Sequence, residues 1–138
     1  MRVLVDTSVW SLAFRKNHKT AYDAELIEYL SKLVRELRVV MIGPIRQEIL
    51  SGISIESKFM EMRDKLSIFS DLPIETEDYE LAAKLYNECR KKGIQGSHID
   101  FLICAVAKHG NFPILTLDKD FESYMKIIGI QLDKKEFD

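Results

Sequence analysis

Residues 3–10, which read VLVDTSVW, decide how this chain folds. Three consecutive apolar residues predict a short buried strand, of the kind found in parallel sheets. The strand stops at a carboxylate, Asp6, and two hydroxyl residues separate it from the next apolar pair. We therefore expect a strand at residues 2–6 and a helix at residues 8–17. The open question is why a buried strand should end on a charged group.

Helical and strand-like patterns alternate along the rest of the chain. Apolar residues at three- and four-residue steps predict helices, and short apolar runs bounded by glycine or proline predict strands. The expected helices are residues 20–37, 44–52, 55–69, 76–93, 97–110 and 118–128, and the expected strands are 38–43, 112–117 and 129–132. Residues 71–75 indicate a turn or a brief strand. This alternation, without an Asn-Gly hairpin signal, predicts a parallel sheet covered by helices in one α/β domain spanning residues 1–138.

Composition places the chain among globular proteins and restricts its function. Hydrophobic residues make up 46% of the 138 residues and charged residues 30%, so the chain can fold around a core without a disulfide or structural metal. The net charge of −2 does not indicate nucleic-acid binding, although a basic rim can surround an acidic centre. Cys89 and Cys104 lie in apolar helical patterns and indicate reduced core thiols. No apolar run could span a membrane, and we expect a cytoplasmic protein.

Four carboxylates stand at positions where α/β proteins bind ligands, beyond the carboxyl ends of strands or nearby. Asp6 and Asp118 each follow an apolar run, Asp100 lies in the first turn of the most apolar helix, and Glu48 lies on a short helix. Each also has a structural alternative. Asp6 and Asp118 could cap helices, Ser97 and Asp100 could form a capping box, and Glu48 could be a solvated helix residue.

These carboxylates indicate a function only when they are considered together. Several carboxylates buried together must be neutralised or must hold a cation. Mg²⁺, or Mn²⁺ in its place, prefers carboxylate oxygens, water and phosphate oxygens as ligands. A metal at the strand edge would explain why the first strand ends on Asp6, with the hydroxyls of Thr7 and Ser8 orienting the carboxylate and its waters.

Four segments, in this order, resemble the PIN-domain nucleases, and most closely the VapC-type toxins. The segments are VLVDTSVW (3–10), PIRQEIL (44–50), GSHIDFLICAVAKHG (96–110) and PILTLDKDF (113–121). The resemblance extends from residue 1 to about residue 132. It implies a PIN-like three-layer α/β/α sandwich with a central parallel sheet.

The resemblance also implies a site. The family's acidic pocket corresponds to Asp6, Glu48, Asp100 and Asp118, as catalytic residues and metal ligands. Asp120 matches a position that is acidic in some members, and Ser8 resembles the pocket hydroxyl. The implied activity is endoribonucleolytic hydrolysis of RNA phosphodiester bonds, leaving 5′-phosphate and 3′-hydroxyl ends, with a metal-bound water as nucleophile. The implied partners are a small antitoxin protein and a second copy of the chain.

RNA phosphates require cations near the acidic centre. Arg15 and Lys16 follow the first helix, and Arg46 lies two residues from Glu48, so these three are candidate substrate-binding residues. The alternative is that they are solvated charges or complement helix ends.

Rival classes of protein fit less well. A haloacid-dehalogenase-type phosphatase needs D-x-D after its first strand, a receiver domain needs paired acids there, and neither GxGxxG nor GxxxxGK[ST] occurs. Two alternatives remain within the resemblance: a housekeeping RNA-processing nuclease, and a non-catalytic PIN-like module that binds protein.

Overall fold

A three-stranded parallel sheet lies at the centre of the fold, within the residues that the computed structural model describes, 1–15, 17 and 20–133. Strand β1 (Val3–Val5) lies between β2 (Val39–Val40) and β3 (Ile114–Leu115). Both neighbours run parallel to β1, which confirms the predicted parallel sheet. The sheet therefore has one edge where all its strands end, and the residues that follow those strands gather there.

Single bridges extend the sheet on both sides. Met41 bridges to Asp71 beside β2, and Ile114 bridges to Leu132 beside β3. The expected closing strand at residues 129–132 is thus reduced to one bridge. Gly129 adopts a left-handed conformation with φ 67°, directly after the last helix, so only the end of this segment reaches β3.

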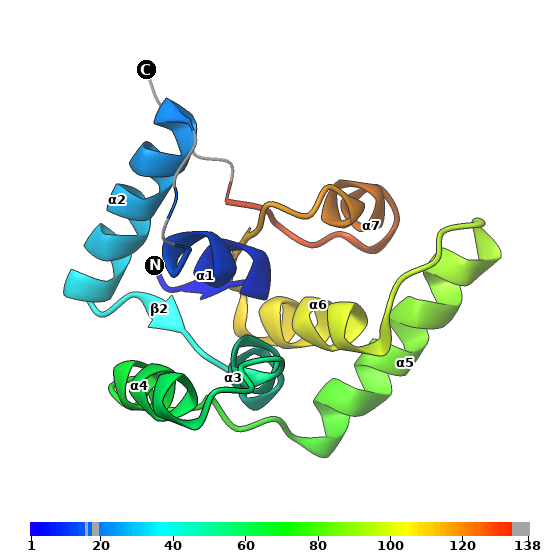
Figure 1. Ribbon diagram of the computed structural model, residues 1–138. Coiled ribbons are helices and arrows are strands. Elements are labelled where there is room, and N and C mark those ends of the chain that lie inside the picture. Colours follow the sequence, from blue (N-terminus) through cyan, green and yellow to red (C-terminus); the bar gives the residue numbers. More distant parts are fainter. Residues whose placement is uncertain (16, 18–19, 134–138) are drawn as a thin grey trace.

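Helices flank the sheet and join its strands (Figure 1). They are α1 (Thr7–Ala13), α2 (Ala21–Arg35), α3 (Gly43–Leu50), α4 (Glu56–Leu66), α5 (Thr76–Lys91), α6 (His98–Gly110) and α7 (Asp120–Ile128). In Figure 1, α6 lies between α1 and α5, while α2 and α5 lie at opposite ends of the view. In the part of the chain that the structure describes, no helix combines the length and hydropathy needed to cross a membrane.

Every helix is shorter than the pattern predicts, and for three of them a local reason is evident. The first ends at Ala13, with Phe14 as its C-cap residue, because the sequence after Phe14, RKNHKT, offers no further apolar side chain to bury. Helix α4 ends at Leu66, whose carbonyl accepts a hydrogen bond from Arg46 instead of continuing the helix. Helix α7 begins at Asp120, two residues later than predicted, because residues 116–119 form the turn that leaves β3.

Helix α6 is the central helix that its apolar sequence predicts. Residues 101–107 are all buried, and the hydrophobic core extends from them to β1, β2, β3 and α7. Cys104 lies in this core and Cys89 lies on the buried face of α5, and both thiols are free. Burial raises the pKa of both thiols, so they remain protonated, as core residues of this kind do.

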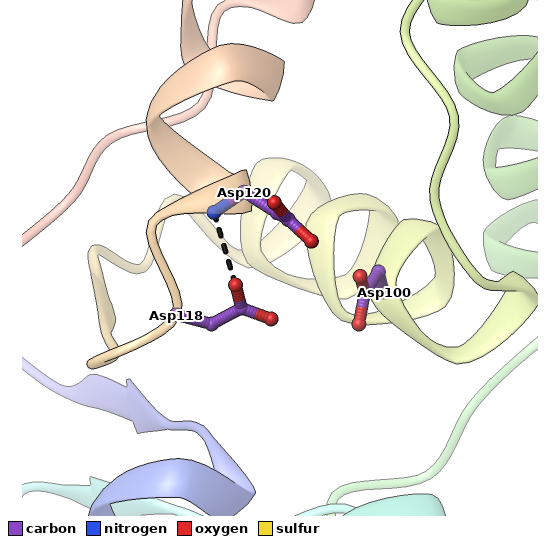
Figure 2. A group of neighbouring side chains, drawn as sticks. All are labelled: Asp100, Asp118 and Asp120. Atoms are coloured by element: carbon purple, nitrogen blue, oxygen red, sulfur yellow. Dashed lines mark hydrogen bonds between the residues drawn. The ribbon is translucent and has the colours of Figure 1, made fainter.

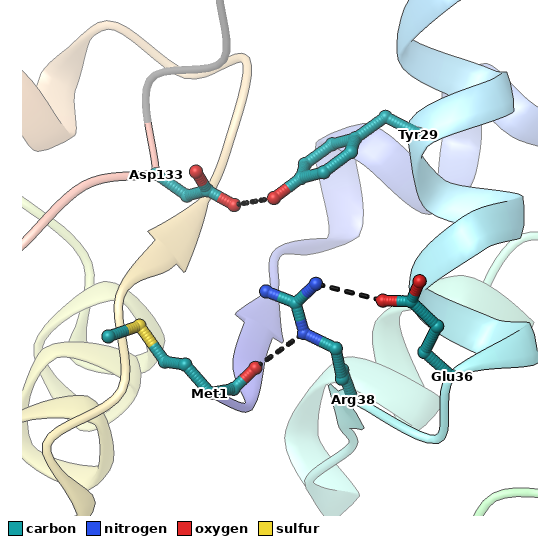
Figure 3. A network of polar contacts seen from close by, with 5 residues as sticks. All are labelled: Met1, Tyr29, Glu36, Arg38 and Asp133. Carbon is teal, nitrogen blue, oxygen red and sulfur yellow. Dashed lines mark hydrogen bonds and ion pairs between the residues drawn. The ribbon is translucent and has the colours of Figure 1, made fainter.

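A polar network ties the first and last described residues to α2 (Figure 3). The Arg38 guanidinium donates to the Met1 carbonyl, with an N–O distance of 2.7 Å, and to Glu36 at 3.0 Å. The Tyr29 hydroxyl on α2 donates to the Asp133 carboxylate. Burial, together with this hydrogen bond, raises the pKa of Tyr29 to about 12.

Candidate functional site

The register of the sheet places Asp6 beside the segment that follows β3. Val5 pairs with Leu115, and the Asp6 amide donates to the Leu115 carbonyl over 2.9 Å. Because the two strands are parallel, the residues after each of them leave the sheet at the same edge. Asp6, at the end of β1, therefore meets Thr116, which follows β3 directly.

Two hydroxyl groups hold the Asp6 carboxylate. Its Oδ2 atom accepts hydrogen bonds from Ser8 Oγ and from Thr116 Oγ1, each at 2.8 Å. The side chain is only 7% exposed, and although Asp6 is the N-cap residue of α1, its carboxylate makes no capping hydrogen bond. Both hydroxyl bonds use Oδ2, so neither occupies Oδ1. The capping alternative for Asp6 is thus not realised.

The same hydroxyls connect Asp6 to the turn after β3. Ser8 Oγ accepts from the Leu117 amide at 3.0 Å, and Thr116 Oγ1 accepts from the Asp118 amide at 3.0 Å. Each hydroxyl thus donates to the Asp6 carboxylate and accepts from the backbone that carries Asp118. This network fixes the position of one acidic residue relative to the other.

Three carboxylates converge at the carboxyl edge of the sheet: those of Asp100, Asp118 and Asp120. One oxygen from each lies within 4.8 Å of the others, and Figure 2 shows them directed into the space between the start of α7 and the first turn of α6. Asp118 Oδ1 also accepts from the Asp120 amide at 3.0 Å, so Asp118 holds the start of the last helix as well. Two residues two positions apart within a helix would point to different faces. Asp118 lies before the first residue of α7, so it can point to the same place as Asp120.

Asp100 is directed toward α7. Its Oδ2 atom accepts from the Tyr124 hydroxyl at 2.7 Å, while its amide donates to Ser97 Oγ at 3.1 Å. Ser97 therefore caps α6 as the sequence suggests, but the Asp100 side chain faces Tyr124. Burial raises the pKa of Asp100, and the charges of Asp118 and Asp6 raise it further. The side-chain hydrogen bonds with Tyr124 and Ser97 act in the opposite direction and lower it.

Glu48 on α3 contacts Thr7, the residue that follows Asp6. Its carboxylate is exposed on α3 and accepts from Thr7 Oγ1 at 2.8 Å. Among the described residues, the group of three carboxylates includes neither Glu48 nor Asp6. Thr7 nevertheless joins Glu48 to the residue next to Asp6, so the four predicted acids lie in one region, and two of them, Asp100 and Asp118, belong to the group of three.

Of the candidate substrate-binding residues, Arg46 is held by groups outside the acidic centre. The Arg46 guanidinium donates to Asp71 at 3.0 Å, to the Leu66 carbonyl at 2.9 Å and to the Phe69 carbonyl. These contacts favour a structural role for Arg46. Arg15 is exposed just after α1, and Lys16 lies outside the described residues.

The residues present fit a hard divalent cation. Asp100, Asp118 and Asp120 offer only carboxylate oxygens, which Mg²⁺ and Mn²⁺ accept. Their mutual repulsion, combined with the partial burial of Asp100, is the electrostatic situation that a bound cation relieves. The arrangement can therefore hold an ion while leaving positions for water or a phosphate.

Sequence reasoning missed two residues that contact these acids, Thr116 and Tyr124. In each segment a hydroxyl residue lies two positions from an aspartate: Ser8 follows Asp6, and Thr116 precedes Asp118. This spacing could have identified Thr116 as a hydroxyl near a carboxylate. Tyr124 follows Asp120 by four positions and so lies on the same face of α7. That spacing identifies the face but does not identify Asp100 as the partner.

A protein-family model, described as the PIN domain, matches residues 3–127. The chain belongs to the PIN domain family. In this PIN domain, the match begins at the first residue of β1 and ends one residue before the end of α7. It therefore includes the five carboxylates of the candidate site, those of Asp6, Glu48, Asp100, Asp118 and Asp120.

Solved structures share the fold of this PIN domain. They include VapBC2 from Rickettsia felis bound to a DNA fragment from their promoter, with a TM-score of 0.78, 16% identity, and coverage of 99% of this chain and 100% of the other. The FitAcB complex from Neisseria gonorrhoeae gives a TM-score of 0.76 at 18% identity, covering 96% of each chain. FitAB bound to the IR36 DNA fragment gives a TM-score of 0.74 at 18% identity, covering 95% of this chain and 93% of the other. A search of curated proteins found no match.

Proposed function

We propose that this PIN domain is a metal-dependent endoribonuclease and the toxin of a toxin–antitoxin pair. The observation that supports it most is the convergence of Asp100, Asp118 and Asp120 at the sheet edge, with buried Asp6 beside them. Burying like charges together is costly, and a cation is the simplest compensation. RNA is the proposed substrate because the resemblance to the VapC-type PIN nucleases implies it, and its phosphate oxygens can complete the coordination of such an ion.

Each acid has a proposed task. Asp100 and Asp118 hold the ion, with Asp120 and the Oδ1 atom of Asp6 as further oxygen donors. Glu48, which is exposed and oriented by Thr7, positions the attacking water or a second ion. Bound Mg²⁺ or Mn²⁺ would lower the pKa of a coordinated water and offset charge on the phosphate.

The hydroxyls of Ser8 and Thr116 contribute by orientation. Both donate to one oxygen of Asp6, which limits the rotation of that carboxylate. Carboxylates that are already held in place lower the entropic cost of positioning the phosphate and the attacking water. Arg15 and Lys16 are proposed to contact RNA phosphates outside the acidic centre.

Cleavage of a labelled RNA tests the catalytic part of this proposal. Wild-type protein should cut the RNA with Mg²⁺ or Mn²⁺ and not with EDTA, and Asp6→Asn and Asp118→Asn should reduce cleavage to the EDTA level. Asp64→Asn, which alters an exposed carboxylate on α4, serves as the matched control and should remain active. Cleavage in EDTA, or full activity of Asp6→Asn, would refute the metal mechanism.

The proposed partners are an antitoxin and a second copy of the chain. The solved structures with this fold include VapBC2 and FitAB complexes, which supports the antitoxin proposal. Two observations would distinguish a toxin from a housekeeping nuclease. The first is a small neighbouring reading frame that encodes a DNA-binding protein, and the second is growth arrest by the PIN domain that co-expression of the DNA-binding protein relieves. A non-catalytic module would show neither RNA cleavage nor metal binding.

A further inference from the structure

Tyr124 is a fully buried residue whose only polar atom faces the acidic centre. The side chain has 0% exposure, and its hydroxyl donates to Asp100 Oδ2 at 2.7 Å. Buried tyrosines place their hydroxyl on a partner, because an unpaired buried hydroxyl is costly. Here that partner is a proposed metal ligand on another helix.

The ring of Tyr124 is fixed by its neighbours. Its centroid lies 4.8 Å from that of Phe101 and 5.2 Å from that of Phe121. Gly96 leaves room for the hydroxyl, because a Cβ atom at that position would clash with the Tyr124 hydroxyl oxygen. The hydroxyl therefore has one position, and the absence of a side chain at Gly96 provides the space for it.

Tyr124 also joins the two elements that carry the carboxylates. It lies four residues after Asp120, on the same face of α7, while Asp100 lies in the first turn of α6. Its hydrogen bond therefore joins α7 to α6 at one of the three carboxylates. The bond orients Asp100 and sets the separation of α6 from α7 at that point.

We infer that Tyr124 is a positioning residue for metal binding: its hydroxyl holds Oδ2 of Asp100, so that the other oxygen, Oδ1, is directed toward the ion. The inference rests on the proposed metal-dependent function. Groups that hydrogen-bond to metal ligands orient those ligands and change metal affinity by roughly 10–100-fold when removed. Tyr124 supplies that interaction without contacting the ion itself.

Titration with Mn²⁺, followed by electron paramagnetic resonance of the free ion, tests the inference without relying on activity. Tyr124→Phe should raise the Kd for Mn²⁺ by roughly 10–100-fold. Gly96→Ala should raise it in the same direction, because the new methyl group displaces the hydroxyl without removing it. Tyr86→Phe is the matched control: its ring also packs on Phe101, but its hydroxyl accepts a hydrogen bond from Arg90 instead.

The outcomes separate this inference from the proposed function. Wild-type binding that Asp118→Asn abolishes and that Tyr124→Phe leaves unchanged overturns the positioning role alone. Wild-type protein that binds no Mn²⁺ overturns both. Thermal unfolding without metal reports the structural part: a lower Tm with unchanged Mn²⁺ affinity means that Tyr124 only stabilises the fold. If Tyr124→Phe does not fold, the affinity of Gly96→Ala decides between the same outcomes.

Discussion

At the scale of single residues, Asp100 combines partial burial with neighbouring negative charge. Burial raises its pKa, so the folded protein binds this proton more tightly than the unfolded chain does. Stability therefore falls as the pH rises through the interval between the unfolded and folded pKa values. Above that interval, the ionised carboxylate destabilises the metal-free fold.

Asp100→Asn should consequently raise the Tm of the metal-free protein by a few degrees at neutral pH. The gain should disappear at a pH below the unfolded pKa, near 4, where wild-type Asp100 is also neutral. Asparagine can still accept the Tyr124 hydrogen bond through its amide oxygen, so packing is retained. Thermal melts in EDTA across this range measure the effect, with Asp64→Asn as control. A lower or unchanged Tm at neutral pH would contradict the electrostatic account.

At the scale of secondary-structure elements, Arg46 connects α3 to the segment that follows α4. Its guanidinium satisfies the carbonyls of Leu66 and Phe69 and pairs with Asp71 at 2.9 Å. These are charge-assisted bonds to groups at and just beyond a helix end, where backbone carbonyls lack intrahelical donors. The sequence placed Arg46 among candidate RNA contacts because it is close to Glu48, but this geometry supports a role in the fold.

Arg46→Met should lower the free energy of unfolding by about 2–3 kcal/mol, because the helix-end carbonyls lose their charged donor. RNA cleavage per folded molecule should be nearly unchanged. Urea unfolding and the cleavage assay measure the two effects, and Arg63→Met, which removes an exposed arginine on α4, should change stability by less than about 0.5 kcal/mol. Loss of RNA binding with full stability would instead support the substrate role.

Tyr29 gives a second prediction at this scale, because it joins α2 to Asp133. Its pKa rises from 10.0 to about 12 in the folded protein. The folded state thus keeps a proton that the unfolded chain loses, so this part of the stability is complete below pH 10 and is lost between pH 10 and about 12.

Tyr29→Phe should cost about 1 kcal/mol at neutral pH, through the lost hydrogen bond, and should reduce the loss of stability at alkaline pH. Urea unfolding at increasing pH measures both effects. Asp133→Asn keeps the tyrosine but removes the acceptor charge, and should make the alkaline loss of stability smaller, so that it ends at a lower pH. An unchanged alkaline profile in both variants would mean that this contact does not contribute to stability.

At the scale of the whole molecule, the proposed ion would join segments that are far apart in the chain. Asp100 lies on α6, Asp118 and Asp120 lie at the start of α7, and Asp6 ends β1. Because unfolding separates these segments, an ion that they share binds the folded state alone. Binding then stabilises the whole domain.

Added Mn²⁺ should therefore raise the free energy of unfolding by roughly 2.7 kcal/mol at a concentration 100-fold above Kd. EDTA should reverse the effect, and Asp118→Asn should abolish it. Thermal unfolding at several Mn²⁺ concentrations measures this dependence. An equal rise in wild type and in Asp118→Asn would indicate an ion bound elsewhere.

Much of this architecture could be predicted from local patterns. The apolar runs and helical periodicities identified β1, β2, β3 and the helices, with errors at their ends. Helix ends such as Leu66 depend on partners that are distant in the sequence, here Arg46, and so leave no local signal. The closing strand was overestimated for a similar reason, since only the neighbouring β3 decides how many residues of that segment pair.

Local sequence patterns are enough to predict that Asp6 and Asp118 leave the sheet at a common edge, because parallel strands end on the same side. They are also enough to predict that α6 is buried, because its apolar residues surround the helix. The contacts of Asp120 and Tyr124 with Asp100 become visible only in the folded molecule. Those contacts depend on how α6 and α7 pack against each other, and helical periodicity specifies which face is buried but not which residue lies opposite it.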